Sequence, residues 1–362
     1  MGKLAFIIHS LGRGGAERTV VSLAECFSSS REVCIYTNTD VRHDRFAVDK
    51  KILRKTYGTI RAGKFKNLLQ TFIDFRRIIV NHNTLVVFMP STAMKLIIAK
   101  LSLDLFSSNC KTQIIITERA DPNTNLESKL SKVLRSFLYK FSDIVVCQTE
   151  GAKLALDPRG RLNVKVIGNG AKEPDKQIRR IESAKRTPVK IAFVGRLTDL
   201  KNPLLLPEIC EKLGQLGIEE PVTIAGGGKL KHKLIEKFKS QNIVNYVHLG
   251  EIDNVDDLFA DLGVLVFISK SEGFPNVILE ALSWGWEVVS FDIKFGPAEI
   301  AQYDKRLHLV KYMDIDALVS KICNVNQKIS QPSYNRRFHL HQSLTQTHVF
   351  KLWNDLIAGK TE

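Results

Sequence analysis

The sequence predicts an α/β protein made of two doubly wound units. Two observations carry this prediction: short apolar runs alternate with amphipathic helical patterns along the whole 362-residue chain, and one polar stretch, residues 168–188, has no apolar period. Apolar strands separated by helices indicate parallel sheets covered on both faces. The length fits two domains of ordinary size. We therefore expect two Rossmann-like units around a central cleft, where ligands of such sheets bind.

The first half supplies six predicted strands and four predicted helices. The strands are Leu4–His9, Glu32–Thr37, Leu85–Met89, Gln113–Thr117, Ile144–Gln148 and Val164–Ile167. The helices are Ala16–Phe27, Lys66–Val80, Ala93–Leu105 and Leu126–Phe141. This alternation predicts an N-terminal Rossmann-like domain over residues 1–172.

The pattern restarts at Lys190–Val194 and predicts a second domain over residues 173–340. Its further strands are Val222–Ala225, Tyr246–Leu249, Val264–Ile268 and Val288–Phe291. An aromatic-rich helix at His348–Ile357 belongs to a last segment, residues 341–362, that we expect to pack back on the first domain.

The charge is distributed unevenly. The chain has a net charge of +15; residues 1–172 hold 28 Lys and Arg against 14 Asp and Glu, and residues 173–362 hold 25 against 24. A one-sided surplus favours an anionic partner, and each basic residue near an anionic membrane contributes about 1 kcal/mol. We therefore expect contact with anionic membrane, and no nucleic acid, since no known binding module accompanies the charge. The basic residues concerned are Lys50, Lys51, Arg54, Lys55, Arg61, Lys64 and Lys66.

Other features restrict the protein class. The six cysteines lack CxxC or zinc-like spacing and are expected to be reduced and mostly buried. The apolar run Leu4–Ile8 is too short for a signal peptide, and Leu85–Phe106 is interrupted by charges, so no transmembrane span is expected. These features predict a cytoplasmic protein, peripheral on the cytoplasmic face of the membrane.

A first glycine-rich loop, Leu11–Arg18, joins the first strand to a helix. Glycines there allow a phosphate to approach, and a helix start offers N–H groups and a positive dipole. A tight strand-to-helix turn is the plainer interpretation. A dinucleotide-binding GxGxxG starting at Gly12 fails, because its sixth position is Glu17.

Two more loops follow strands of the second domain. Val194–Pro203 carries Arg196 and Lys201, which could be solvated surface charges or phosphate ligands. Thr223–Gly228 ends in three glycines, which form a flexible turn or let a base or phosphate approach.

The segment Ser271–Ala281 is the most informative. Pro275 suits the first helical position, and Phe274, the predicted N-cap, has no side-chain oxygen. The amides of Asn276, Val277 and Ile278 are therefore expected to be available to an anion. Two acids, Glu272 and Glu280, lie on either side of this helix start.

These motifs together resemble retaining glycosyltransferases of family 4, which have the GT-B fold. The resemblance rests on the two glutamates, on Gly195-Arg196 with Lys201, and on the segment Gly14–Arg18, and it spans nearly the whole chain. Gly296–Ile300 also resembles a segment of members that build bacterial surface polysaccharides.

The resemblance implies a role for each site residue. Arg196 and Lys201 would hold the donor diphosphate and Glu280 the ribose, while Glu272 would face the transferred sugar beside the amides of Gly273 and Phe274. Gly14 and Gly15 would close on the phosphates from the other domain. The expected substrates are a nucleotide sugar, with UDP as carrier, and a lipid-linked or saccharide acceptor; no cofactor and no metal are expected.

The implied mechanism retains the anomeric configuration. The acceptor hydroxyl would attack from the side that the diphosphate leaves, and the diphosphate would take the proton. A double displacement with Glu272 as nucleophile is the alternative, which the resemblance favours less.

Two stretches depart from the family pattern. Ile116–Pro122 lacks the histidine that many relatives carry there, so Glu118 or Arg119 is expected on the acceptor side. Ser283–Glu287 holds two tryptophans where small residues and proline are usual, which we interpret as altered packing, with effects on the donor sugar as the alternative. The competing functions are a sugar-nucleotide epimerase or phosphorylase on the same fold, and a non-catalytic membrane-bound partner of a polysaccharide-synthesis complex.

Overall fold

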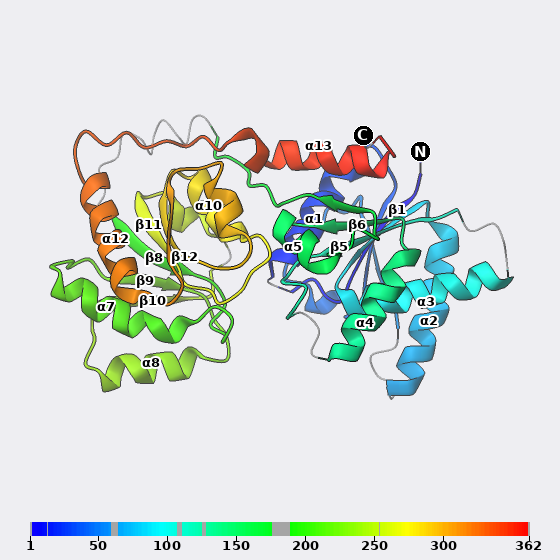
Figure 1. Cartoon of the computed structure of the whole chain (residues 1–362), viewed down its shortest axis with the longest axis horizontal. Helices are drawn as coiled ribbons and strands as arrows, with labels where there is room; N and C mark the ends of the chain where they lie inside the picture. Colours follow the sequence, from blue (N-terminus) through cyan, green and yellow to red (C-terminus); the bar gives the residue numbers. More distant parts are fainter. Residues whose placement is uncertain are drawn as a thin grey trace. The chain divides into compact units, whose positions relative to one another are not determined.

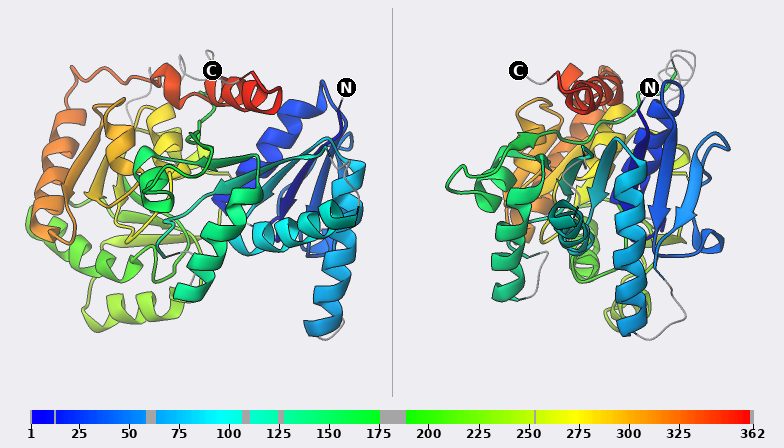
Figure 2. Two further views of the ribbon diagram at one scale, coloured as in Figure 1. Left: turned by 45° about the vertical axis from the view of Figure 1, so that its right-hand side comes forward. Right: turned by 90° about the vertical axis from the view of Figure 1, so that its right-hand side faces the viewer.

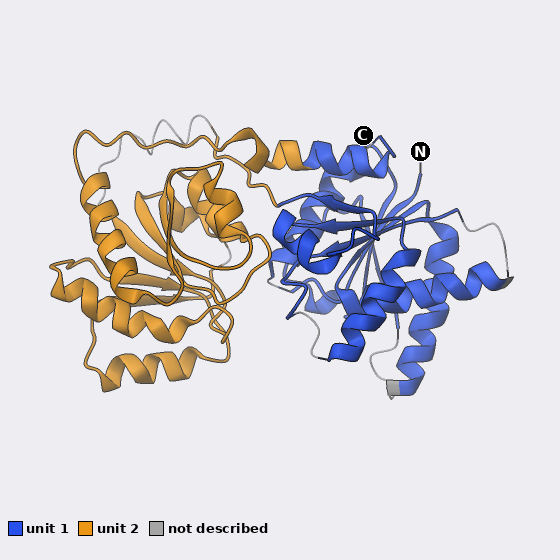
Figure 3. Cartoon of the chain, viewed as in Figure 1, with its two compact units in different colours: residues 1–168, 350–362 blue, residues 169–349 orange. Residues whose placement is uncertain are grey.

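A computed structural model describes residues 2–12, 14–58, 64–106, 111–124, 128–175, 189–252 and 254–360. The chain divides into two compact units: residues 1–168 with 350–362, and residues 169–349 (Figure 3). Most of the predicted linker, residues 176–188, lies outside the described part of the chain, as do Arg61 and Cys110.

The first unit contains a seven-stranded parallel sheet in the order β3-β2-β1-β4-β5-β6-β7 (Figure 1). Its strands are β1 Leu4–Ile8, β2 Val33–Thr37, β3 Leu53–Thr56, β4 Thr84–Phe88, β5 Gln113–Glu118, β6 Ile144–Cys147 and β7 Val164–Val166. β1, β2, β4 and β6 are buried along their whole length, which is why they appear as apolar runs in the sequence.

Helices cover both faces of this sheet. They are α1 Gly15–Ser28, α2 Lys64–Asn81, α3 Pro90–Phe106, α4 Lys129–Leu138 and α5 Glu150–Leu156, with short 3-10 turns η1 Val41–His43 and η2 Tyr139–Phe141. α3 contacts both α2 and α4 on one face, and α1 packs on β1 and β2 (Figure 2). The sequence pattern missed the edge strand β3 and the short helix α5.

The second unit contains a six-stranded parallel sheet in the order β10-β9-β8-β11-β12-β13. Its strands are β8 Lys190–Val194, β9 Val222–Ala225, β10 Tyr246–Gly250, β11 Gly263–Phe267, β12 Glu287–Asp292 and β13 Leu307–Lys311. All five predicted strands are confirmed; β13 was not predicted. β8 and β11 are adjacent, so the loops that follow them leave the same edge of the sheet.

The helices of the second unit are α7 Leu206–Gln215, α8 Lys231–Ser240, α9 Asp256–Phe259, α10 Asn276–Ser283, α11 Pro297–Ala301 and α12 Ile315–Ile329, with 3-10 turns η3 Pro203–Leu205 and η4 Gln342–Leu344. The last helix, α13 Gln346–Ile357, confirms the predicted C-terminal helix, and the division between the two units falls inside it, after Val349.

Two fully or almost fully buried tryptophans explain an unusual stretch of sequence. Trp286 stacks edge-on against Phe259 at 4.9 Å, and its indole N–H donates to the carbonyl of Asp261 at 2.6 Å. Trp284 donates to a carboxylate oxygen of Asp256 at 2.9 Å. Both side chains belong to the core of the second unit, as the packing interpretation expected.

Candidate functional site

The loop after β8 carries the two predicted phosphate ligands. Arg196 is exposed, whereas Lys201 is partly buried and its ammonium lies 5.7 Å above the ring of Phe267. Asn202 adopts a left-handed conformation, φ 56°, which turns the chain into η3. The carbonyl of Leu200 accepts a hydrogen bond of 2.8 Å from the amide of Lys270, so this loop is fixed to the loop after β11.

Lys201 and Glu272 form an ion pair across these two loops, between Nζ and Oε1. The exposed fractions of their side chains are 17% and 14%. Residues 71 positions apart are therefore brought together at one sheet edge, and each charge of the pair is largely shielded from water.

The helix that follows Glu272 begins one residue later than predicted. Pro275 is the N-cap of α10, with ψ 113°, and Asn276 is the first helical residue; the prediction of Phe274 as N-cap and Pro275 as first helical residue is wrong. Proline at the N-cap has no side chain that accepts from the first amides, and no side-chain cap is formed. The helix start keeps the dipole expected of it.

The predicted donor-binding residues of the second unit lie at or next to this helix start. Gly273 and Phe274 are buried, Asn276, Val277 and Glu280 are partly buried, and the side chain of Ile278 is fully buried in the core of the second unit. Arg196, Lys201, Glu272 and the start of α10 therefore belong to the loops at the carboxyl ends of neighbouring strands β8 and β11.

The loop preceding α11 lies close to the loop that leads into α10. Gly296 has φ 93°, and a Cβ at this position would lie 2.8 Å from the carbonyl oxygen of Gly273 and 2.7 Å from the ring of Pro275. Its amide donates to the Glu299 carboxylate at 2.8 Å. The Gly296–Ile300 motif thus packs against the loop that leads into α10.

The triple glycine after β9 packs backbone against backbone. A Cβ on Gly226 would come within 1.9 Å of the carbonyl oxygen of Gly195, and one on Gly228 within 2.6 Å of that of Leu197. The amide of Leu197 donates to the carbonyl of Gly227 at 2.7 Å. These glycines therefore hold the Arg196 loop in place, a role that the sequence interpretation did not include.

Asn169 is a site residue that sequence reasoning missed. Its side-chain amide donates a hydrogen bond of 2.7 Å to the carbonyl of Phe274, and Asn169 is buried. The following residue, Gly170, is so close to Thr345 that a Cβ would lie 2.6 Å from its carbonyl oxygen. The Asn-Gly pair inside a polar stretch was the available signal.

The predicted residues of the first unit lie around the start of α1. Gly14 is the N-cap of α1 without a side-chain cap, and the carboxylate of Glu17 lies against it, 2.1 Å from where a Cβ would stand. The hydroxyl of Thr19 donates to the carbonyl of Gly15 at 2.9 Å and accepts from the Arg119 guanidinium at 2.9 Å. Arg119 therefore bonds to α1 directly after the first glycine loop, and burial lowers its pKa to about 10.

Glu118, the other candidate for the acceptor side, points into the protein. It is 1% exposed, accepts a hydrogen bond of 2.7 Å from the Tyr139 hydroxyl, and lies 3.7 Å from the Arg135 guanidinium. Burial and the Glu118 charge raise the pKa of Tyr139 well above its ordinary value, so Tyr139 remains a donor. In the structure Glu118 therefore belongs to a buried polar cluster behind the sheet edge.

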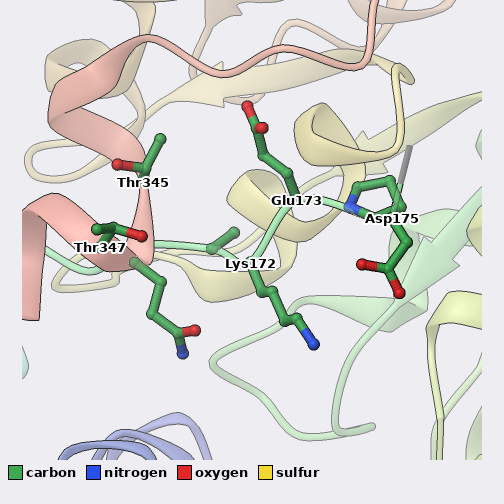
Figure 4. Close-up of a pocket in the computed structure, with 8 residues that line it drawn as sticks. Lys172, Glu173, Asp175, Thr345 and Thr347 are labelled. Carbon is green, nitrogen blue, oxygen red and sulfur yellow. The ribbon is translucent and has the colours of Figure 1, made fainter. Parts of the chain in front are cut away.

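A surface pocket of about 330 Å³ lies elsewhere in the second unit (Figure 4). Residues 171–175 and residues 345–347 at the start of α13 line it, and most of their side chains are polar. None of the predicted donor-binding residues contributes to its walls, so this pocket is not assigned to the donor. Among the described residues, no group of three or more His, Cys, Asp or Glu side chains is placed to hold a metal ion.

Known proteins resemble this chain in sequence and in fold. Residues 174–336 match the family described as glycosyl transferases group 1. The chain is 26% identical, over 99% of its length and 100% of the relative, to the amylovoran biosynthesis glycosyltransferase AmsD of Erwinia amylovora. It is also 26% identical, over 99% of both chains, to the Campylobacter jejuni alpha-1,4-N-acetyl-D-galactosaminyltransferase whose name includes a diphospho-undecaprenol-linked saccharide.

Solved structures share the fold over the whole chain. Anabaena HepE in complex with UDP and glucose matches with a TM-score of 0.80 at 15% identity, covering 99% of this chain and 100% of that one. Staphylococcus aureus TarM in complex with UDP matches with a TM-score of 0.78 at 13% identity over 99% and 100%. The two parallel α/β units thus form a GT-B fold.

Proposed function

We propose that this chain, whose residues 174–336 match the family of glycosyl transferases group 1, transfers a sugar from a UDP-sugar to a lipid-linked or saccharide acceptor in the synthesis of a bacterial surface polysaccharide. The named roles of similar proteins support the pathway: amylovoran synthesis in one relative and a polyprenyl-diphosphate-linked saccharide in two others. UDP in structures of the same fold supports the choice of carrier.

The Lys201–Glu272 ion pair next to the start of α10 is the observation that carries the proposal. In the free protein each side chain neutralises the other. A bound donor would place its diphosphate against Lys201 and Arg196, and Glu272 would then be released to accept hydrogen bonds from hydroxyls of the sugar. Glu280, about one turn into α10, would accept from the ribose.

Electrostatic stabilisation of the leaving diphosphate would supply the catalysis. Negative charge grows on the diphosphate as the sugar–phosphate bond breaks, and prearranged cations and amides lower the energy of that state. At about 4 Å and an effective dielectric of about 20, each cation contributes roughly 4 kcal/mol before desolvation. Two cations and a helix start can therefore do the work of a metal ion, and we propose transfer without one.

We propose that the configuration at the anomeric carbon is retained. The acceptor hydroxyl attacks from the face that the diphosphate leaves, the bond to the diphosphate oxygen breaks, and that oxygen takes the hydroxyl proton. In this proposal Glu272 orients the sugar by accepting hydrogen bonds from its hydroxyls and does not attack the anomeric carbon. Gly14, Gly15 and Arg119 form the second group of candidate contacts, in the first unit.

The acceptor implies a place for the protein at a membrane surface, on the cytoplasmic face where nucleotide sugars are made. None of the described helices is both long enough and apolar enough to span a bilayer. Of the predicted basic cluster, Lys50, Lys51 and Lys55 are exposed, whereas Arg54 pairs with Asp44 at 2.8 Å inside the first unit. The side chain of Lys64 lies outside the described part.

A donor panel tests the activity. The purified protein is incubated with UDP-, GDP- and dTDP-sugars and a bacterial lipid extract, and both released nucleotide and glycosylated product are measured. Release of UDP that depends on the acceptor supports the proposed transfer. An α-linked product from an α-linked donor supports retention, and unchanged activity after treatment with EDTA supports transfer without a metal ion. Release of a changed nucleotide sugar without acceptor would indicate an epimerase, and no turnover of any donor would indicate a non-catalytic protein.

A further inference from the structure

Helix α4 exposes a row of large apolar side chains. Within residues 128–141 the exposed fractions are 77% for Leu130, 67% for Val133, 44% for Leu134, 54% for Phe137 and 38% for Phe141. These positions repeat every three or four residues and therefore lie along one side of the helix. The rings of Phe137 and Phe141 contact each other edge to face at 5.5 Å.

The opposite side of α4 anchors it to the first unit. Arg135 and Leu138 are buried, and Arg135 is the ion-pair partner of Glu118. The hydroxyl of Ser128 caps the helix by accepting from the amide of Ser131 at 3.0 Å, and Lys132 donates to the carbonyl of Asn123. The apolar row is thus the outer face of a well-fixed helix.

The charged residues within residues 128–142 are all positive, and Glu127 and Asp143 are the nearest acidic residues on either side in the sequence. Residues 128–142 include four basic and no acidic residues, and Lys129 and Lys140 are exposed. α2 repeats the pattern at its start, where Phe65 is 80% exposed and Leu68 and Leu69 are each 53% exposed. The first turns of α2 and α4 lie at the same lower edge of the first unit in each view (Figure 2).

We propose that α4 is an interfacial helix that inserts this apolar row into an anionic lipid bilayer. An apolar row flanked by lysines matches the boundary between acyl chains and phosphate headgroups. A second copy of the chain fits less well, since a two-fold contact over the row would bring the lysines of both copies together. This inference rests on the proposed function for the lipid-linked acceptor and differs from the Lys50–Lys55 cluster expected from sequence.

Vesicle binding of the full chain tests the proposal. The probe is a vesicle of phosphatidylcholine with phosphatidylglycerol, compared with phosphatidylcholine alone. V133S/F137S should weaken partitioning by about tenfold or more, because two exposed apolar anchors are lost. K129E/K140E should weaken binding to the anionic vesicle selectively, and this loss should shrink at high salt.

Matched controls alter similar side chains in the second unit. V244S/L216S removes two apolar side chains that are 87% and 60% exposed, and K233E/K239E makes the same charge change on α8. Both controls should bind vesicles almost as the unaltered protein does. If V133S/F137S binds as well as its control, or if K51E/K55E alone abolishes binding, the proposal is wrong.

Two more measurements separate this inference from the proposed function. V133S/F137S should still transfer sugar to a short-chain, water-soluble acceptor, because the altered residues lie outside the donor site. A protein that binds vesicles through α4 yet turns over no donor would contradict the proposed function alone. If the unaltered protein is a dimer and V133S/F137S is a monomer with unchanged vesicle binding, a second copy covers the row and the inference fails.

Discussion

The side-chain amide of Asn169 donates a 2.7 Å hydrogen bond to the carbonyl oxygen of Phe274. Asn169 is the first residue of the second unit, and Phe274 lies in the loop that connects Glu272 to α10. The bond fixes the peptide that follows Phe274, directly before the helix start. The first residue of the second unit is therefore hydrogen-bonded to the proposed donor loop.

Removing this bond should affect both stability and turnover. N169A leaves a buried carbonyl without its amide donor, so we expect a loss of about 1–3 kcal/mol in the free energy of unfolding. We also expect kcat to fall more than KM for the donor rises, because the loop loses its orientation while its ligands remain. N245A is the control, since Asn245 makes a similar bond of 3.1 Å to the carbonyl of Ile218. Equal kcat for the two variants would contradict this role.

The Lys201–Glu272 pair gives a second prediction. K201A and E272Q should each lower kcat by about 100-fold or more, because each removes a charge that the proposed transition state uses. Each variant leaves a partner charge unpaired and should unfold at a lower temperature, but circular dichroism should show it folded at the assay temperature. K212A and D316N break a more exposed Lys–Asp pair between α7 and α12, Nζ to Oδ1 2.5 Å, and should keep normal rates. Near-normal turnover in both K201A and E272Q would remove the site assignment.

Gly226 should not tolerate a side chain. G226A would place a Cβ 1.9 Å from the Gly195 carbonyl oxygen at φ 144°, so the Arg196 loop must move. We expect a destabilisation of about 2 kcal/mol or more in urea unfolding, together with weaker donor binding. G214A in α7 is the control, because a Cβ there meets no atom within 4 Å. A stable G226A with normal donor affinity would show that the close packing is unimportant.

The carboxylate of Glu287 should make the free energy of unfolding smaller in acid. Burial disfavours its charge, but hydrogen bonds from His308 at 2.7 Å and Lys328 at 3.0 Å outweigh burial and lower its pKa below 4.5. A carboxylate with a lowered pKa stabilises the folded state above its unfolded pKa and loses that contribution as pH falls through the folded value. The urea concentration at the unfolding midpoint should therefore fall as the pH is lowered below about 4.5. This fall should be less steep in E287Q than in the unaltered protein. An identical acid dependence of the two would contradict the prediction.

Much of the fold followed from local sequence pattern. Most of the strands found in advance are buried, β7 and β10 excepted, and buried parallel strands appear as continuous apolar runs. β3 was missed because it is an edge strand with the composition Leu-Arg-Lys-Thr and an exposed Leu53. The side chain of Asp314 caps α12 by accepting from the amide of Ala317 at 3.0 Å.

The parts that could not be predicted depend on contacts between distant residues. Asn169 and Phe274 are 105 positions apart, and no local period links them. The glycines at 226–228 were interpreted as a flexible turn or a ligand loop. Their packing against the backbone of residues 195–197 could not be predicted, because those residues are distant in the sequence. Glu118 follows an apolar run, and its inward direction depends on Tyr139 and Arg135, which come from the η2 turn and α4.

A crystal structure with an intact UDP-sugar or with UDP tests the central claim most directly. We predict that the diphosphate lies between the side chains of Arg196 and Lys201 and the first amides of α10, at hydrogen-bonding distances of about 3 Å, with the Lys201–Glu272 pair opened. Phosphates bound elsewhere, for example in the pocket lined by residues 172–175 and 345–347, would contradict it.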